Sequence, residues 1–153
     1  IGSKPTFLNE VERVNKKQIA NIITLLEKKV GSIKLKKITV LGTAFKPNTD
    51  DVRDSTSIKL IKKLLEKGAK VIVHDPKAIE NTQKIFGDKI EYQKSITKSL
   101  KKSNCAIIMT QWKQYKKINN NSIKNMKNKI IIDSRRLLVN KKISVDYNAL
   151  GIG

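Results

Sequence analysis

The chain has 153 residues, a formal net charge of +20, one cysteine and one histidine. Its length fits one compact domain with an attached element, and no apolar run is long enough to span a bilayer. The single cysteine, Cys105, excludes an internal disulfide bond, and with His74 as the only histidine we expect no metal site built from Cys and His. The first residues lack the apolar segment of a signal peptide, so we expect a cytoplasmic protein without a membrane partner.

The positive charge alone does not predict nucleic-acid binding. The lysines are spread over every segment, and the few aromatic residues do not alternate with them. A nucleic-acid-binding protein instead gathers its basic residues in one patch, and a single-strand binder adds a platform of aromatic rings. We therefore interpret the lysines as solvated faces and expect no nucleic-acid partner. The charge still favours an acidic partner domain or an anionic ligand such as a pyrophosphate.

The first predicted element is a helix from about Pro5 to Val30. Pro5 stands near its start, where a missing N–H costs little, Ser3 or Thr6 can cap it, and Gly31 follows its last apolar position. Such a helix must pack on this domain, on another domain or on a second subunit. Its apolar residues recur at three- and four-residue steps and form one stripe: Leu8, Val11, Ile19, Ile22, Ile23, Leu26 and Val30.

Short apolar runs and amphipathic segments alternate in the rest of the chain. Continuously apolar runs are typical of strands covered on both faces, and four occur, at 38–41, 71–73, 106–109 and 130–132. Weaker strands are predicted at 90–92 and 145–147, and helices at 55–66, 77–86, 95–102 and in parts of 115–126. The order predicts an α/β fold, a Rossmann-like doubly wound parallel sheet over 37–153, with the preceding helix in a separate unit, 1–36.

Ligands of such sheets lie beyond the carboxyl ends of the strands, near the point where the strand order reverses. The richest segment there is 42–55, GTAFKPNTDDVRDS, which lacks the Gly-x-Gly-x-x-Gly fingerprint of a dinucleotide site. Lys46 and Arg53 suit phosphate oxygens, and Ser55 or Asp54 can cap the next helix, whose N-terminus favours anions. An equally good interpretation is that Arg53 simply pairs with the aspartates of this loop.

Other strand ends carry fewer chemical groups. Arg135 and Arg136 directly follow a buried strand, on the ligand side, which favours anion binding. Without the glycine fingerprint, Asp75 is interpreted as part of a structural Asp-Pro turn rather than as a ribose ligand. We interpret Cys105 as a buried structural thiol, and Trp112 and Tyr115 as packing residues.

Several segments follow one another in a specific order. After 42–55 come VHDP at 73–76, MTQW at 109–112, IDSRR at 132–136 and the ending ALGIG at 149–153. Together they resemble the C-terminal, UDP-binding domain of the UDP-glucose/GDP-mannose dehydrogenase family, and the helix at 5–30 resembles the end of that family's central helix. The resemblance spans nearly the whole chain.

The resemblance implies a role in NAD-dependent oxidation of the C6 alcohol of a UDP sugar, with UDP-glucose as the expected substrate and UDP-glucuronate, a polysaccharide precursor, as the product. It implies that Phe45, Lys46 and Arg135 contact the nucleotide sugar, Arg135 from the neighbouring subunit, and that Arg53 reaches the pyrophosphate of NAD. It also implies two partners, an N-terminal NAD-binding domain and a second subunit, held in a homodimer through the helix at 5–30.

The chain also departs from the family's pattern. Neither the glycine fingerprint nor the Gly-Gly-Ser-Cys-Phe-like segment that carries the nucleophile occurs in it, and Gln111 and Arg136 replace the family's usual Glu and Asn. We therefore expect no catalytic residue among these 153 residues and no oxidation by this chain alone, which resembles a fragment. The alternative function is a stand-alone, non-enzymatic module that binds UDP.

Overall fold

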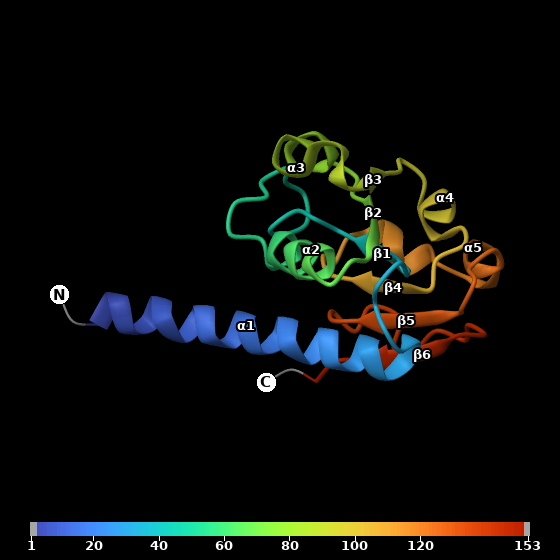
Figure 1. The fold of residues 1–153 in the computed structure, drawn as a ribbon, viewed down its shortest axis with the longest axis horizontal. Helices are drawn as coiled ribbons and strands as arrows, with labels where there is room; N and C mark the ends of the chain where they lie inside the picture. Colours follow the sequence, from blue (N-terminus) through green and yellow to red (C-terminus); the bar gives the residue numbers. More distant parts are fainter. Residues whose placement is uncertain (1–2, 152–153) are drawn as a thin grey trace.

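The computed structural model describes residues 3–151, with side chains from residue 6 onward. Its centre is one parallel sheet with the strand order β3-β2-β1-β4-β5-β6 (Figure 1). The strands are β1 (Lys37–Leu41), β2 (Lys70–His74), β3 (Glu91–Tyr92), β4 (Cys105–Ile108), β5 (Ile130–Asp133) and β6 (Asp146–Ala149). The order reverses between β1 and β4, because β2 and β3 follow β1 on one side and β5 and β6 follow β4 on the other. The predicted Rossmann-like doubly wound fold is confirmed.

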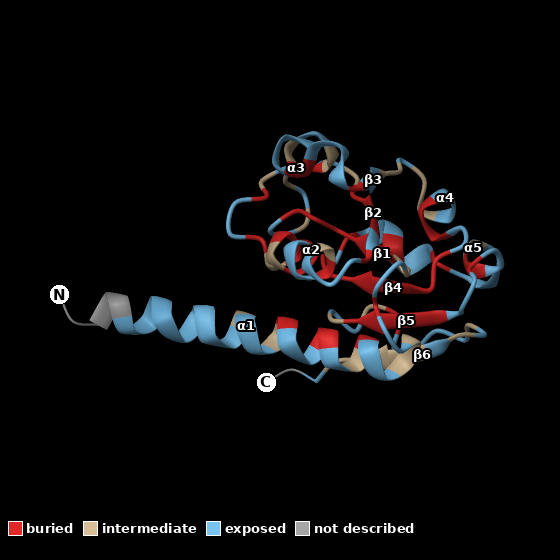
Figure 2. Ribbon diagram, in the orientation of Figure 1, coloured by how far each residue is buried: buried red, intermediate tan, exposed pale blue. Residues whose placement is uncertain are grey.

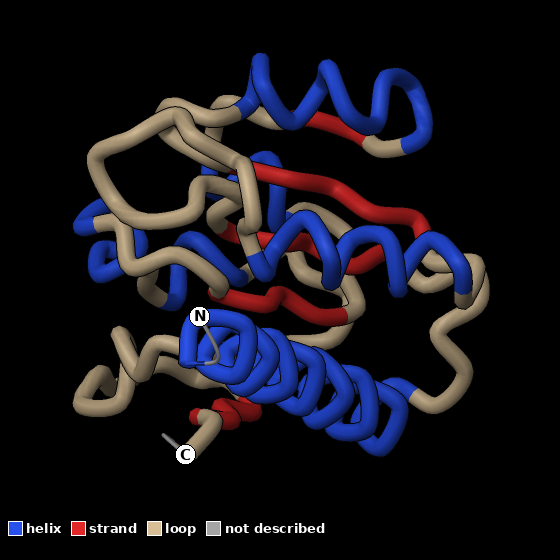
Figure 3. The backbone as a smooth tube through the Cα atoms, turned by 90° about the vertical axis from the view of Figure 1, so that its left-hand side faces the viewer, coloured by secondary structure: helices blue, strands red, loops and turns tan. Residues whose placement is uncertain are grey.

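Helices cover both faces of the sheet, as continuously apolar central strands require. Helices α1 and α2 contact each other, and α4 contacts α5, β1 and β2. Figure 3 shows helices on both sides of the strands. Every residue of β4 and β5 is buried, so these strands contribute fully to the core. The helical elements are α1 (Ser3–Val30), α2 (Thr56–Glu66), α3 (Ile79–Phe86), η1 (Gly87–Lys89), α4 (Ile96–Leu100), η2 (Lys113–Lys117) and α5 (Asn120–Ile123).

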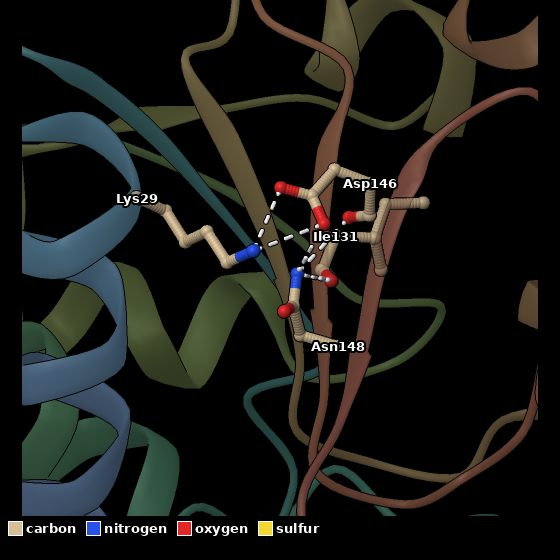
Figure 4. Close-up of polar contacts among 4 residues, drawn as sticks. All are labelled: Lys29, Ile131, Asp146 and Asn148. Atoms are coloured by element: carbon tan, nitrogen blue, oxygen red, sulfur yellow. Dashed lines mark hydrogen bonds and ion pairs between the residues drawn. The ribbon is translucent and has the colours of Figure 1, made fainter.

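Helix α1 packs on the domain through its C-terminal half, as the burial of its described residues shows. Ile22 and Leu26 are completely buried there, whereas the apolar side chains of the N-terminal half remain exposed (Figure 2). Lys29 Nζ lies 3.0 Å from a carboxylate oxygen of Asp146 in the edge strand β6 (Figure 4). The exposed half extends beyond the sheet at the end where the strands have their carboxyl termini (Figure 1).

One predicted contact is wrong in detail. Ser55 does occupy the N-cap position of α2, but its hydroxyl makes no capping hydrogen bond and instead donates to the carbonyl oxygen of Thr43, 2.8 Å away. The hydroxyl is therefore used to close the 42–55 loop rather than the helix end. The predicted last strand begins one residue later than expected, at Asp146, and continues to Ala149. The final residues of the ALGIG ending, 152 and 153, lie outside the described part of the chain.

Candidate functional site

A small cavity of about 110 Å³ lies at the carboxyl end of the sheet, where the strand order reverses. Segments after three neighbouring strands form its wall: the loop after β1, the turn after β4 and the turn after β5. Crevices at such switch points are the usual ligand sites of doubly wound sheets. The cavity is lined by Phe45, Lys46, Pro47, Thr110, Gln111 and Arg135. Three of the residues singled out by the sequence, Phe45, Lys46 and Arg135, therefore come together.

The loop that carries Phe45 and Lys46 leaves β1 through a tight contact with the neighbouring strand end. Gly42 has a φ of +96°, and a Cβ at this position would lie 2.5 Å from the Cβ of Thr110. Only glycine fits this position, because a side chain would be both strained and in collision. The Thr110 hydroxyl then donates to the carbonyl oxygen of Ala44, 2.9 Å away. Gly42 and Thr110 thus hold the loop after β1 close to the turn after β4, and these two segments form adjacent walls of the cavity.

Lys46 and Arg135 carry positive charge that no carboxylate of the described residues neutralises through an ion pair. Arg135 is held by its Nε, which donates to the carbonyl oxygen of Met109 at 2.7 Å, and by its backbone N–H, which donates to Asp133. Desolvation lowers the pKa of the Arg135 guanidinium, which still remains charged at any physiological pH. Among the described residues no partner is found for its other guanidinium N–H groups, which can therefore bind an anion at the cavity.

Arg53 lies apart from this cavity. Its guanidinium binds the carboxylate of Asp51 through Nε at 3.1 Å and Nη2 at 2.9 Å, and its side chain is 87% exposed. The hydrogen bonds from Arg53 lower the pKa of Asp51 to about 2, with a smaller contribution from the charge of Lys46. The ion pair between Arg53 and an aspartate of the same loop, one of the two interpretations of the sequence, is thus present. Arg53 lines a different hollow, beside Asn81 and Lys84 of α3.

A larger cavity, of about 910 Å³, adjoins the small one and shares Pro47, Gln111 and Arg135 with it. Its lining contains no carboxylate and includes several cationic side chains: Lys77, Lys113, Lys116, Lys117 and Arg135. Trp112 forms part of its wall. The two cavities together offer an anion both volume and uncompensated positive charge.

Two buried aspartates were not identified as site residues from the sequence. Asp75 follows β2 and accepts hydrogen bonds from Thr43, Ala44 and Trp112, and Asp133 ends β5 and accepts one from the Arg135 N–H. Their position in the sequence could have indicated a role in the site, since each stands at the carboxyl end of a predicted strand. His74 is buried and forms a hydrogen bond with Tyr115, so it faces the core.

Neither these aspartates nor any other set of three His, Cys, Asp or Glu side chains among the described residues could hold a metal ion. No helix within the described part of the chain combines the length and apolarity needed to cross a membrane. Cys105 is buried, and burial raises the pKa of its thiol well above the usual value. The thiolate needed for nucleophilic chemistry is thus disfavoured.

Comparison with known proteins identifies relatives over the whole domain. Residues 39–140 match the model of the UDP-glucose/GDP-mannose dehydrogenase family, UDP binding domain. The UDP-glucose 6-dehydrogenase AglM of Haloferax volcanii is 36% identical over 149 residues, which are 97% of this chain and 34% of that protein. TuaD of Bacillus subtilis, also a UDP-glucose 6-dehydrogenase, is 35% identical over 86% of this chain and 29% of its own length.

Solved structures give the same relationship. A UDP-glucose dehydrogenase from Pyrobaculum islandicum superposes with a TM-score of 0.79 at 35% identity, covering 90% of this chain and 30% of that one. The chain thus spans about a third of the length of the relatives it matches. The matched residues 39–140 include the segments that form the two cavities. The chain belongs to the UDP-glucose/GDP-mannose dehydrogenase family and comprises its UDP binding domain.

Proposed function

We propose that the two adjoining cavities bind the UDP moiety of a UDP sugar, and that Lys46 and Arg135 hold its diphosphate. The observation that carries the proposal is that both cations line one cavity at the switch point and neither forms an ion pair within the described residues. A diphosphate would supply the missing negative charge, and a guanidinium can bind two of its oxygens at once.

Phe45 has a separate role in this proposal. The residue is 54% exposed although it is apolar, and it stands next to Lys46 on the cavity wall. An exposed aromatic ring beside a phosphate site suits contact with the sugar that the phosphate carries. Arg135 was expected to act from the neighbouring subunit, but Lys46 of the same chain lines the same cavity, which favours a contact within one subunit.

Arg53 is proposed to contact the pyrophosphate of NAD, which a further domain would bind. The residue fits this role in part: its side chain is exposed, but Nε and Nη2 already donate to Asp51, which leaves Nη1 for a phosphate. When bound, NAD would accept the hydride released on oxidation of the sugar alcohol. What this chain contributes is the Nη1 donor of Arg53, which can orient the cofactor by a hydrogen bond to a phosphate oxygen.

For the whole protein we propose NAD-dependent oxidation of UDP-glucose to UDP-glucuronate, supplying polysaccharide precursors. The curated relatives above are UDP-glucose 6-dehydrogenases, which supports this substrate. We expect the 153 residues alone to be inactive, because neither the dinucleotide fingerprint nor the nucleophile segment occurs in them. A cytoplasmic location belongs to the same proposal and is in keeping with a single, unpaired cysteine.

Titration calorimetry of this chain with UDP-glucose, UDP-N-acetylhexosamines and NAD tests the proposal. We expect the UDP sugars to bind and NAD alone to bind weakly. Lys46→Ala should weaken UDP-sugar binding by roughly 10- to 100-fold, because a hydrogen bond to a charged group contributes about 1.5–3 kcal/mol.

The matched control is Lys70→Ala, which removes the same charge at the start of β2, at the opposite end of the sheet. This variant should bind UDP sugars like the unchanged chain. Equal losses in the two variants would mean that overall charge, not the cavity, attracts the ligand. Absence of any UDP-sugar binding by the unchanged chain would contradict the proposed function itself.

A further inference from the structure

Asp75 accepts more hydrogen bonds than any other carboxylate of the site, although the sequence indicated only a structural turn at this position. The residue is 2% exposed, and its carboxylate accepts five hydrogen bonds from N–H groups. Oδ1 accepts from the backbone of Lys77 at 2.9 Å and of Ala78 at 2.8 Å. Oδ2 accepts from three groups elsewhere in the chain: Thr43 N at 2.8 Å, Ala44 N at 3.0 Å and Trp112 Nε1 at 3.1 Å.

The two carboxylate oxygens of Asp75 bind different parts of the chain. The Oδ1 bonds close a local turn after β2, as aspartate does in many proteins, and this turn was expected from the Asp-Pro pair. The Oδ2 bonds reach residues 31 to 37 positions away in the sequence, at the ends of two other strands. A turn needs none of these, so the Oδ2 bonds require a separate explanation.

The charge of Asp75 is stabilised without a cation. No ion pair among the described residues includes Asp75. A buried carboxylate is costly unless hydrogen bonds replace its hydration, and bonds to a charged acceptor are about twice as strong as neutral ones. The segments that donate these hydrogen bonds are therefore held firmly at the end of β2. Among the described residues, no lysine or arginine of the cavity pairs with Asp75.

The held segments are the ones that form the cavity walls. Thr43 and Ala44 directly precede Phe45 and Lys46, and the Thr110 hydroxyl binds the carbonyl oxygen of Ala44 from the other side. The next residue is fixed as well, since the Phe45 N–H donates to the Asp51 carbonyl at 2.7 Å. Trp112 is both a donor to Asp75 and part of the wall of the larger cavity.

We propose that Asp75 is a positioning residue of the UDP site: its carboxylate joins the loop after β1, the turn after β2 and the indole of Trp112, and so places Phe45 and Lys46 against Arg135. The inference rests on the proposed function of this site. Asp75 acts through the residues it holds and does not itself touch the ligand.

Asp75→Asn tests the proposal with little change of shape. An amide has one acceptor oxygen, so its NH2 group must face either the donors of Oδ1 or those of Oδ2. We expect UDP binding to weaken at least about tenfold by calorimetry, at a temperature where circular dichroism shows a folded chain. Trp112 is the only tryptophan, so its fluorescence spectrum should shift in this variant and respond less to UDP.

Two further variants separate positioning from stability. Asn104→Ala removes a buried side chain whose oxygen accepts from the Lys37 N–H at the opposite end of the sheet. It should lower the melting temperature but leave the UDP affinity unchanged. Trp112→Phe keeps an aromatic ring in the wall of the larger cavity but removes the Nε1 donor to Oδ2. It should weaken UDP binding several-fold, which keeps the test informative if Asp75→Asn does not fold.

The outcomes distinguish this inference from the proposed function. Suppose that the unchanged chain binds UDP and that Asp75→Asn binds it with an affinity within about twofold. The positioning role is then overturned, and the assignment of the UDP site stands. If Asp75→Asn does not fold, the same result for Trp112→Phe leads to the same conclusion. If the unchanged chain does not bind UDP, the proposed function fails first. Weaker binding in Asp75→Asn and Trp112→Phe but not in Asn104→Ala is the expected result.

Discussion

His74 is buried at the end of β2, with its Nδ1 3.0 Å from the Tyr115 hydroxyl. The two rings meet edge to face, with centroids 5.5 Å apart. Tyr115 also donates to the His74 carbonyl oxygen at 3.0 Å, so its hydroxyl links ring and backbone. Burial disfavours the charged imidazolium and lowers the pKa of His74, although the nearby charge of Asp75 partly opposes the shift.

This shift makes the stability of the fold dependent on pH. The pKa of His74 is lower in the folded chain than in the unfolded chain, so the unfolded chain binds the proton first as the pH falls. Stability should therefore be complete above about pH 6.5 and decline below it, by at most about 1.4 kcal/mol per pH unit. Melting temperatures between about pH 7.5 and 5.5 measure this, because His74 is the only histidine.

His74→Phe provides the control for that measurement. The variant keeps a ring in the core but has no group that titrates in this range. Its melting temperature should be nearly constant over the interval where that of the unchanged chain falls. Equal slopes in the two chains would assign the pH dependence to other groups.

Some contacts of the site residues could be predicted from the sequence, and others could not. Lys46 and Arg135 could be placed at one cavity because each follows an apolar strand, and the ends of parallel strands meet at one edge. The ion pair of Arg53 and Asp51 was equally foreseeable, since the two are neighbours in the loop. The Oδ2 contacts of Asp75 were not, because they depend on which distant strand ends become neighbours in space.

Among the elements, α1 divides into a docked half and an exposed half. Leu26 is completely buried against the domain, and two ion pairs, Lys29–Asp146 and Glu27–Lys67, connect the same half to β6 and to the residue that follows α2. The sequence predicted the helix and its apolar stripe. It could not indicate which part of the stripe contacts this domain, because both halves have the same periodicity.

The two kinds of contact should differ in their effect on stability. Leu26→Ala leaves a cavity in the core and should lower the free energy of unfolding by about 2–5 kcal/mol. Lys29→Ala should lower it by no more than about 1 kcal/mol, because exposed ion pairs contribute little. Chemical denaturation of both variants measures the difference. A larger loss for Lys29→Ala would mean that the ion pairs, not apolar burial, attach α1 to the sheet.

For the molecule as a whole, the N-terminal half of α1 presents an apolar surface that the described residues leave exposed. The exposed fractions are 68% for Phe7, 62% for Leu8, 42% for Val11 and 55% for Val14. Apolar side chains in contiguous patches mark interaction sites more often than isolated ones do. Phe7, Val11 and Val14 are four and three residues apart, a spacing that matches an amphipathic helix that packs on a partner. We propose that the partner is α1 of a second copy, and that residues 1–36 form a dimerisation unit.

Val11→Glu tests whether α1 forms the interface of a dimer. A charge in a buried helix interface is strongly unfavourable, so sedimentation velocity should show dimers of the unchanged chain and monomers of the variant. Asn9→Glu adds the same charge two residues away, on the opposite face of a helix with 3.6 residues per turn, and should leave the dimer intact. The two substitutions change net charge equally, so only the position of the new carboxylate differs. A monomeric unchanged chain at every concentration would overturn the dimer and leave the exposed stripe to a different domain.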